Sequence, residues 1–148
     1  MTAWSVVAAL VMLAGCMSQF GVAPAAKPTA GSEIDEVFQS LSAARERAGK
    51  KPPGWVPRLA ALAHEGAQRL GDGGNQQSIA HDIGNRAAYN VMRNVDTWWF
   101  FSDTLAWSEW PPRLLARDGL LVAIGVSLMR TTAPGRHAVF MILLEPGH

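Results

Sequence analysis

The sequence predicts an α+β domain in which two helices near its start pack on a small antiparallel sheet of about four strands, in an α/β/α-like sandwich. Two segments with helical spacing of apolar residues come first, between Ser32 and Leu70. Runs of aromatic and β-branched residues follow, and the chain ends in two long apolar runs separated by Pro134 and Gly135. Helices followed by strands are typical of an α+β fold.

The first helix is expected to begin after Ser32 and to end at Gly49. Ser32 has an acidic residue, Asp35, three positions later, which is a common pattern at helix N-termini. Gly49 suits the end of a helix because glycine adopts the left-handed conformation without strain. Apolar residues recur at three- and four-residue steps between these limits, at Ile34, Val37, Phe38, Leu41 and Ala44.

The second helix is expected from about Pro57, because proline is common at the first position of a helix. A proline-rich loop at 50–55 precedes it, and the glycines of 71–74 stop it. Residues 75–86 are polar without a clear period, and we expect a loop there. The apolar stripe of the second helix consists of Leu59, Leu62, Ala63 and Leu70.

Two short strands are predicted next, at 88–92 and 96–101. The segment 105–116 contains two adjacent prolines, which suit an irregular crossing segment with a short helical turn. The runs 120–129 and 137–144 form a long hairpin. Both sheet faces need cover because side chains alternate along the strand at 96–101, with Trp98 and Phe100 on one face and Trp99 and Phe101 on the other.

The N-terminus has the pattern of a secretion signal. Residues 1–15 carry no charge, and the apolar run 6–14 is too short to cross a bilayer as a helix. The stretch 13–16, Leu-Ala-Gly-Cys, resembles the lipobox of bacterial lipoproteins, in which a peptidase cuts before a cysteine that receives a diacylglyceryl group. Cys16 is the only cysteine of the chain, so it has no partner for an internal disulfide. Lipidation of Cys16 is therefore expected.

This pattern divides the chain into a signal peptide at 1–15, a lipidated cysteine with a flexible linker at 16–31, and one domain at 32–148. It places the protein in the cell envelope, anchored to a membrane by lipid. Met17, the residue after the cysteine, resembles the outer-membrane sorting pattern of Gram-negative lipoproteins. The formal net charge of +1 and the mixed signs of the charged residues exclude the electrostatic pattern of a nucleic-acid-binding protein.

Two segments of the domain carry a family resemblance. Residues 38–63 contain a helix with arginine and glycine near its end, a short loop and the pattern Pro-x-Leu-x-x-x-Ala from Pro57. Residues 111–127 contain Pro-Pro-Arg-Leu-Leu, a spacer and a glycine-containing apolar run. Both segments resemble the CAP superfamily of cysteine-rich secretory proteins, antigen 5 and pathogenesis-related proteins. The chain is similar to a degenerate bacterial member of that superfamily.

The resemblance implies a groove that in this family usually carries two histidines and two acidic residues able to hold a divalent metal. His81 lies where the first histidine would fall, in the expected loop. Tyr89 and Asn90 stand where the family has a Glu-Asn pair, so a tyrosine replaces the glutamate. The second histidine has no counterpart in 107–113. We therefore take His81, Tyr89 and Asn90 as groove candidates, and we expect no metal, no cofactor and no catalytic set.

The favoured function is binding of an apolar ligand or a partner protein by a membrane-anchored, non-catalytic domain. A first alternative is an envelope hydrolase or peptidase that uses His81 or His64 with a carboxylate. The carboxylate candidates are Asp82, Glu65 and Glu109. A second alternative is a structural subunit of an envelope assembly. The dense aromatic residues between 98 and 110 are expected to fill the core, or in part to line a groove or a docking face.

Overall fold

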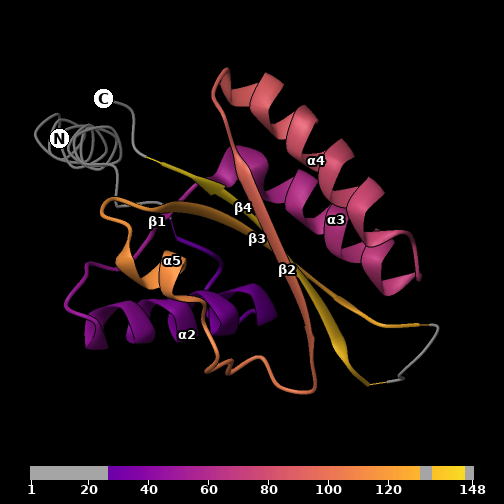
Figure 1. Cartoon of the computed structure of the whole chain (residues 1–148). Coiled ribbons are helices and arrows are strands. Elements are labelled where there is room, and N and C mark those ends of the chain that lie inside the picture. Colours follow the sequence, from indigo (N-terminus) through magenta and orange to yellow (C-terminus); the bar gives the residue numbers. More distant parts are fainter. Residues whose placement is uncertain (1–26, 131–134, 146–148) are drawn as a thin grey trace, which may run out of the picture.

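A computed structural model describes residues 27–130 and 135–145 of the chain (Figure 1). The predicted signal peptide at 1–15 and the predicted lipidation at Cys16 lie outside these residues. In chain order the elements are α2 (Glu33–Arg47), β1 (Gly54–Trp55), a 3-10 turn η1 (Pro57–Leu59), α3 (Ala60–Gly71), α4 (Gln76–Val91), β2 (Asp96–Ser102), α5 (Pro112–Ala116), β3 (Leu121–Leu128) and β4 (His137–Leu144).

The strands form one sheet in the order β1-β3-β4-β2. Strands β3 and β4 pair antiparallel, from Leu121 with Leu144 to Leu128 with His137, which confirms the predicted hairpin. Strand β2 pairs antiparallel with β4, whereas β1 pairs parallel with β3. The sheet is therefore mixed, and the prediction of an antiparallel sheet was wrong for β1. This strand has only two residues, too few for an alternating pattern to show in the sequence.

Helices cover both faces of the sheet, so the α+β prediction and the sandwich are confirmed. Figure 1 shows α2 and α5 on one side of the strands and α3 and α4 on the other. Two separate groups of buried residues reflect the two faces. Alternate residues of β4 belong to different groups, for example Met141 to the α2 side and Phe140 to the α3 side. In β2, Trp98 and Phe100 face α2 while Trp99 and Phe101 face the opposite layer, as predicted.

The start of α2 has the expected form, because the Ser32 hydroxyl accepts a hydrogen bond of 3.1 Å from the backbone N–H of Asp35. The residues just before it belong to the folded domain rather than to a flexible linker. Pro28 is buried, and the Ser32 N–H donates to the Thr29 carbonyl at 3.2 Å. Of the predicted linker at 16–31, the structure describes only 27–31, and Pro28 and Thr29 of this part contact the domain.

The largest difference from the sequence-based prediction is α4. Residues 75–86 were expected to be a loop and 88–92 a strand, and both expectations were wrong, because Gln76–Val91 form one helix of 16 residues. Asn75 caps the helix by accepting a bond of 2.9 Å from the Ser78 N–H. The buried stripe of α4 combines two isoleucines with two alanines, which makes its apolar period weak: Ile79, Ala80, Ile83 and Ala87.

Arg45 of α2 is an arginine buried in the core, with 1% of its surface exposed. Its guanidinium donates hydrogen bonds to three backbone carbonyls: Nε to Lys51 at 2.9 Å, Nη1 to Leu114 at 2.6 Å and Nη2 to Arg117 at 2.7 Å. Burial lowers the pKa of Arg45, and the charge of Asp118 partly opposes that shift. Arg45 thus ties α2 to the loop before β1 and to the end of α5.

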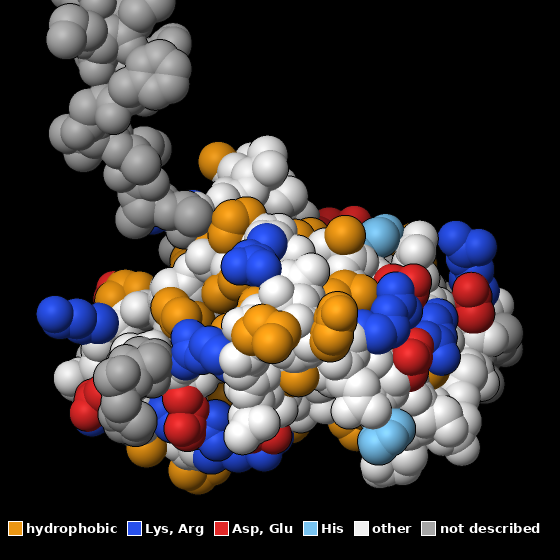
Figure 2. Space-filling view, turned by 90° about the horizontal axis from the view of Figure 1, so that it is seen from above, with side chains coloured by type: hydrophobic (Ala, Val, Ile, Leu, Met, Phe, Trp, Pro, Cys, Tyr) orange, Lys and Arg blue, Asp and Glu red, His pale blue; other side chains and the backbone are white. Residues whose placement is uncertain are grey.

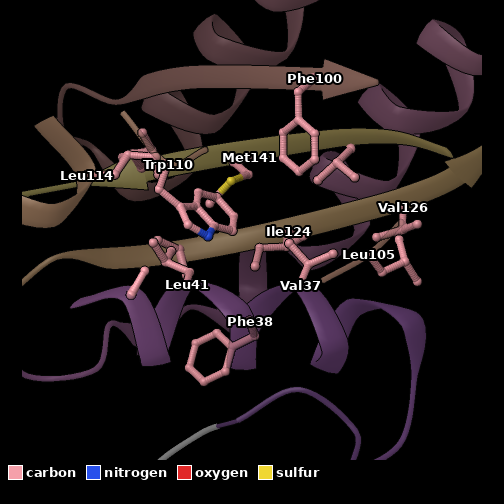
Figure 3. Packing of buried hydrophobic residues seen from close by; sticks show 14 of the residues in the cluster. Val37, Phe38, Leu41, Phe100, Leu105, Trp110, Leu114, Ile124, Val126 and Met141 are labelled. Atoms are coloured by element: carbon pink, nitrogen blue, oxygen red, sulfur yellow. The ribbon is translucent and has the colours of Figure 1, made fainter. Parts of the chain in front are cut away.

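Four of the aromatic residues that follow α4 fill the layer between the sheet and α2: Trp98, Phe100, Trp107 and Trp110. Phe100 of β2 stacks on Trp107 with ring centroids 4.5 Å apart, and Trp110 contacts both Phe100 and Trp98. Figure 3 shows Phe100 and Trp110 pointing toward the aliphatic side chains of α2 and the sheet, among them Leu41 and Ile124. These rings contribute mainly to core packing.

On the opposite face, small residues let α3 approach the sheet closely. A Cβ atom added to Gly125 of β3 would lie 2.1 Å from the carbonyl oxygen of Ala63 in α3. Gly66 of α3 likewise leaves room for the ring of Phe140 in β4, because a Cβ atom at Gly66 would lie 2.8 Å from that ring. The close approach of α3 to the sheet therefore depends on Gly125 and Gly66, and also on Gly71, where an added Cβ would lie 2.6 Å from the carbonyl oxygen of Leu128.

Candidate functional site

The three groove candidates lie on one helix but do not surround one groove. His81, Tyr89 and Asn90 all belong to α4, so the placement of His81 in a loop was wrong. His81 lines a cleft between α4 and the start of β2. Tyr89 and Asn90 line a neighbouring hollow with Leu62 of α3. In the described part of the chain, His81 and Tyr89 thus line two neighbouring hollows.

The cleft beside His81, which we name the α4–β2 cleft, has a volume of about 410 Å³. Its walls come from one side of α4 and from 94–99 at the start of β2. The polar residues that line it are Gln77, His81, Asn85, Asn94, Asp96 and Thr97, and its one large ring is that of Trp99. Nε2 of His81 lies 3.2 Å from the side-chain nitrogen of Asn85 on the next turn, so this histidine contacts an amide and not a carboxylate.

The carboxylates proposed for a hydrolase are held in an ion-pair network between α3 and α4. Arg69 contacts Asp82 at 2.6 Å and Glu65 at 3.8 Å. Arg86 contacts Asp82 at 3.4 Å and also pairs closely with Glu65. The hydrogen bond from Arg69 is the main reason why the pKa of Asp82 lies below its ordinary value. Asp82 is therefore a paired anion, and a poor general base.

The remaining catalytic candidates are not brought together with these groups. His64 is exposed on α3 and makes no side-chain hydrogen bond to the described residues. Glu109 is exposed next to Trp110, whose ring packs on the α2 side of the sheet. Since α3 and α4 cover the opposite side, Glu109 belongs to another layer of the sandwich than His64 and His81.

The C-terminal end of α4 exposes two large apolar side chains. Tyr89 is 82% exposed and Met92 is 80% exposed. Arg58, Arg86 and Arg93 lie around them, and we name these five residues together with Leu62 the α4 end surface. Figure 2 views the molecule from the side of α3 and α4, where hydrophobic side chains gather among basic ones. Tyr89 stands between two hollows of about 480 Å³ each.

The backbone around this surface is held firmly. Arg58 donates to the side-chain oxygen of Asn90 at 3.1 Å and to its backbone carbonyl at 2.7 Å, which fixes the end of α4 against η1. Met92 ends the helix with φ = 53°, and among the described residues it is the only one other than glycine with a positive φ. Met92 could not be recognised as a helix end because 88–92 was predicted to be a strand. Arg58 was missed for the same reason, since its partner Asn90 lies in that segment. The four-residue step from Ile83 to Ala87 was the available signal.

His137, which has no acidic neighbour in the sequence, gains one in the fold. Its Nε2 lies 3.0 Å from a carboxylate oxygen of Glu33 at the start of α2. This contact joins the beginning of β4 to the beginning of α2, far from the α4–β2 cleft in the sandwich. It therefore belongs to the packing of the domain and not to the candidate site.

In the part of the chain that the structure describes, no three His, Cys, Asp or Glu side chains are grouped so that they could hold a metal ion. None of the described helices is both long and apolar enough to span a bilayer. The chain matches no model of a known protein family, no curated protein and no solved structure.

Proposed function

We propose that this chain is a lipoprotein of the cell envelope, anchored through Cys16, whose CAP-like domain acts by binding an acidic partner protein at the α4 end surface. The observation that carries the binding role is the exposure of Tyr89 and Met92, at 82% and 80%. Large apolar side chains that stand together in solvent mark interaction sites in soluble domains. Tyrosine, methionine and arginine are also the residues enriched in protein interfaces.

The backbone of Met92 supports this role. A left-handed conformation costs a residue with a side chain about 1 kcal/mol relative to glycine, and glycine is the usual residue at this position after a helix. Met92 adopts it with φ = 53° while its own side chain is exposed and adds little to the core. A strained residue that does not stabilise the fold is typical of a functional surface.

The charges around Tyr89 favour an acidic partner. Arg58 and Arg93 have no acidic partner among the described residues, and Arg58 bonds only to the amide and carbonyl of Asn90. Arg86 is the one arginine here that is paired, with Glu65 and Asp82. The surface is therefore positive overall, and a complementary partner would carry carboxylates around an apolar centre.

The relation between the two CAP-like segments supports the family part of the proposal. Residues 38–63 and 111–127 are distant in sequence, yet β1 pairs with β3 and Arg45 bonds to the carbonyls of Leu114 and Arg117. The two segments that carry the resemblance therefore contact each other in the fold, as expected if they belong to one domain of that superfamily.

The ion pairs of Asp82 and Glu65 favour binding over hydrolysis. Peptide or ester hydrolysis that disappears in His81→Ala would contradict this reading.

The binding role predicts opposite effects on stability and on function for Met92→Gly. Glycine relieves the left-handed backbone, so we expect the free energy of unfolding to rise by about 1 kcal/mol. The same change removes an apolar contact, so binding should fall several-fold. Denaturant unfolding measures the first effect. Binding is measured by crosslinking in cells, with p-benzoylphenylalanine placed at position 89. The readout is the yield of a single crosslinked adduct of fixed mass.

Leu128→Ala provides the control for this experiment, because Leu128 is also an exposed large apolar residue, at 53%, but lies at the end of β3. The adduct yield should not change in this variant. An unchanged yield in Met92→Gly, or an equal loss in both variants, would contradict the proposed surface.

The anchor is tested by feeding cells an alkyne-bearing fatty acid and comparing the parent chain with Cys16→Ala. We expect label on the parent chain and none on the variant. The variant should also be longer than the parent, because cleavage before the cysteine follows its lipidation and the variant therefore keeps its signal peptide. A parent chain without label would refute the anchor. It would leave the binding surface to be judged by the Met92→Gly experiment.

A further inference from the structure

The α4–β2 cleft is lined by side chains that suit a ligand rich in hydroxyl groups. Gln77 and Asn85 project from α4, and Asn94 and Thr97 come from the opposite wall. Amide side chains both donate and accept hydrogen bonds, as does the threonine hydroxyl. Such groups match the hydroxyl and acetamido groups of a sugar, each of which also donates and accepts.

Much of this hydrogen-bonding capacity is unused within the protein. Across residues 27–130 and 135–145, no hydrogen bond to another protein group engages the side chains of Gln77, Asn94 or Thr97. Asn85 uses only its nitrogen, toward His81 at 3.2 Å. Since Gln77, Asn85 and Asn94 are exposed, a ligand can reach them without any rearrangement of the fold. The cleft therefore offers several convergent polar groups, a feature of small-molecule sites.

The charge of the cleft argues against an anionic ligand. No lysine or arginine lines it. Its one acidic residue, Asp96, is already paired with Arg117 at 3.2 Å and with Arg113 at 3.8 Å. Apart from Trp99, the apolar residues of the lining are small, being alanines, Gly84 and Val95. Phosphates and acyl chains would both find few favourable contacts here, whereas a neutral polar ligand would find many.

Trp99 gives the cleft an aromatic wall. Its ring lies nearly parallel to that of Phe140, with an interplanar angle of 9° and centroids 6.3 Å apart. Its indole N–H donates to Gln76 at 2.9 Å, which fixes the orientation of the ring. The C–H groups on one face of a pyranose pack well on a flat ring that is held in place. An aromatic wall beside amide side chains is thus an arrangement that suits a sugar.

From these contacts we infer that the α4–β2 cleft is a binding site for a neutral saccharide. The ring of the sugar packs at Trp99, and its hydroxyl or acetamido groups bond to Gln77, Asn85 and Asn94. The volume of about 410 Å³ falls in the range of small-molecule sites and suits one or two sugar units. The inference does not depend on the α4 end surface, since neither Tyr89 nor Met92 lines this cleft.

Isothermal titration of the full-length chain in a mild detergent tests this site with three probes: tri-N-acetylchitotriose, maltotriose and inorganic phosphate. We expect saturable binding of at least one oligosaccharide and none of phosphate. Loss of one hydrogen bond in Gln77→Ala or in Asn94→Ala should weaken binding about 3- to 10-fold. Ser78→Ala is the matched control on the same helix, because Ser78 is exposed and does not line the cleft, and its affinity should equal that of the parent.

Gly84→Ala tests the cleft with a variant that should fold as stably as the parent. A Cβ at Gly84 has only the Thr97 methyl within 4 Å, at 3.5 Å, so alanine is tolerated in the helix while it narrows the cleft. We expect weaker binding without a lower denaturation midpoint. Three results would overturn the inference: no saturation with either oligosaccharide, binding unaffected by both Gln77→Ala and Asn94→Ala, or tighter binding of phosphate than of sugar.

Discussion

Replacing Arg45 by methionine is expected to lower the free energy of unfolding by about 3 kcal/mol, because the change removes one buried and two part-buried hydrogen bonds to carbonyls. Three carbonyl groups, those of Lys51, Leu114 and Arg117, accept from the guanidinium in the folded protein. Methionine has a similar length and fills most of the space, so the loss reports mainly on hydrogen bonding and not on a cavity.

Denaturant unfolding of Arg45→Met is best compared with Arg47→Met. Arg47 is exposed near the end of the same helix, and its replacement should change the free energy of unfolding by less than about 0.5 kcal/mol. Arg45→Lys should fall between the two, because an ammonium group cannot reach three carbonyls in the planar geometry of a guanidinium. Equal effects of Arg45→Met and Arg47→Met would show that the carbonyl bonds add nothing to stability.

Gly125→Ala is the second substitution with a large expected effect. The new Cβ would lie 2.1 Å from the carbonyl oxygen of Ala63 and 2.5 Å from the backbone nitrogen of His64. Backbone atoms cannot rotate away as a side chain can, so α3 must shift from the sheet as a whole. We expect a loss of about 3 kcal/mol in the free energy of unfolding, at the upper end of the effects of overpacking.

The matched control for Gly125→Ala is the same change at Gly84, in the middle of α4. There the added methyl meets only the Thr97 side chain at an ordinary contact distance of 3.5 Å, and alanine favours the helix by about 0.5–1 kcal/mol. Thermal unfolding should therefore show midpoints that move in opposite directions. A Gly125→Ala variant as stable as the parent would mean that α3 does not lie as close to β3 as described.

Those elements whose signals are local were predictable from the sequence. The cap at Ser32 and the apolar steps up to Ala44 defined α2, and the apolar runs on either side of Pro134 and Gly135 defined the final hairpin. The segment β1 was not predictable, because its two residues become a strand only by pairing with Leu121 and Val122 in the distant β3. Its identity depends on tertiary structure rather than on local propensity.

The candidate site was less predictable than the fold, since it depends on α4. Alanines at 80 and 87 cover half of the buried stripe of this helix, and a stripe of small residues gives a weak apolar period. Once 76–91 is a helix, Gln77, His81 and Asn85 follow one another on adjacent turns and line one cleft. The sequence identified His81 and Tyr89 as residues of interest, but their separation into two surfaces required the helix.

The position of β4 in the middle of the sheet constrains when the domain can fold. Among the described elements this strand comes last in sequence, yet β3 and β2 both pair with it, so nothing joins these two strands in the sheet until residues 137–144 are present. Long-range pairing of this kind is slow and leaves apolar strands uncovered in the meantime. The apolar faces of β2 and β3 therefore stay open to aggregation until β4 pairs with both strands.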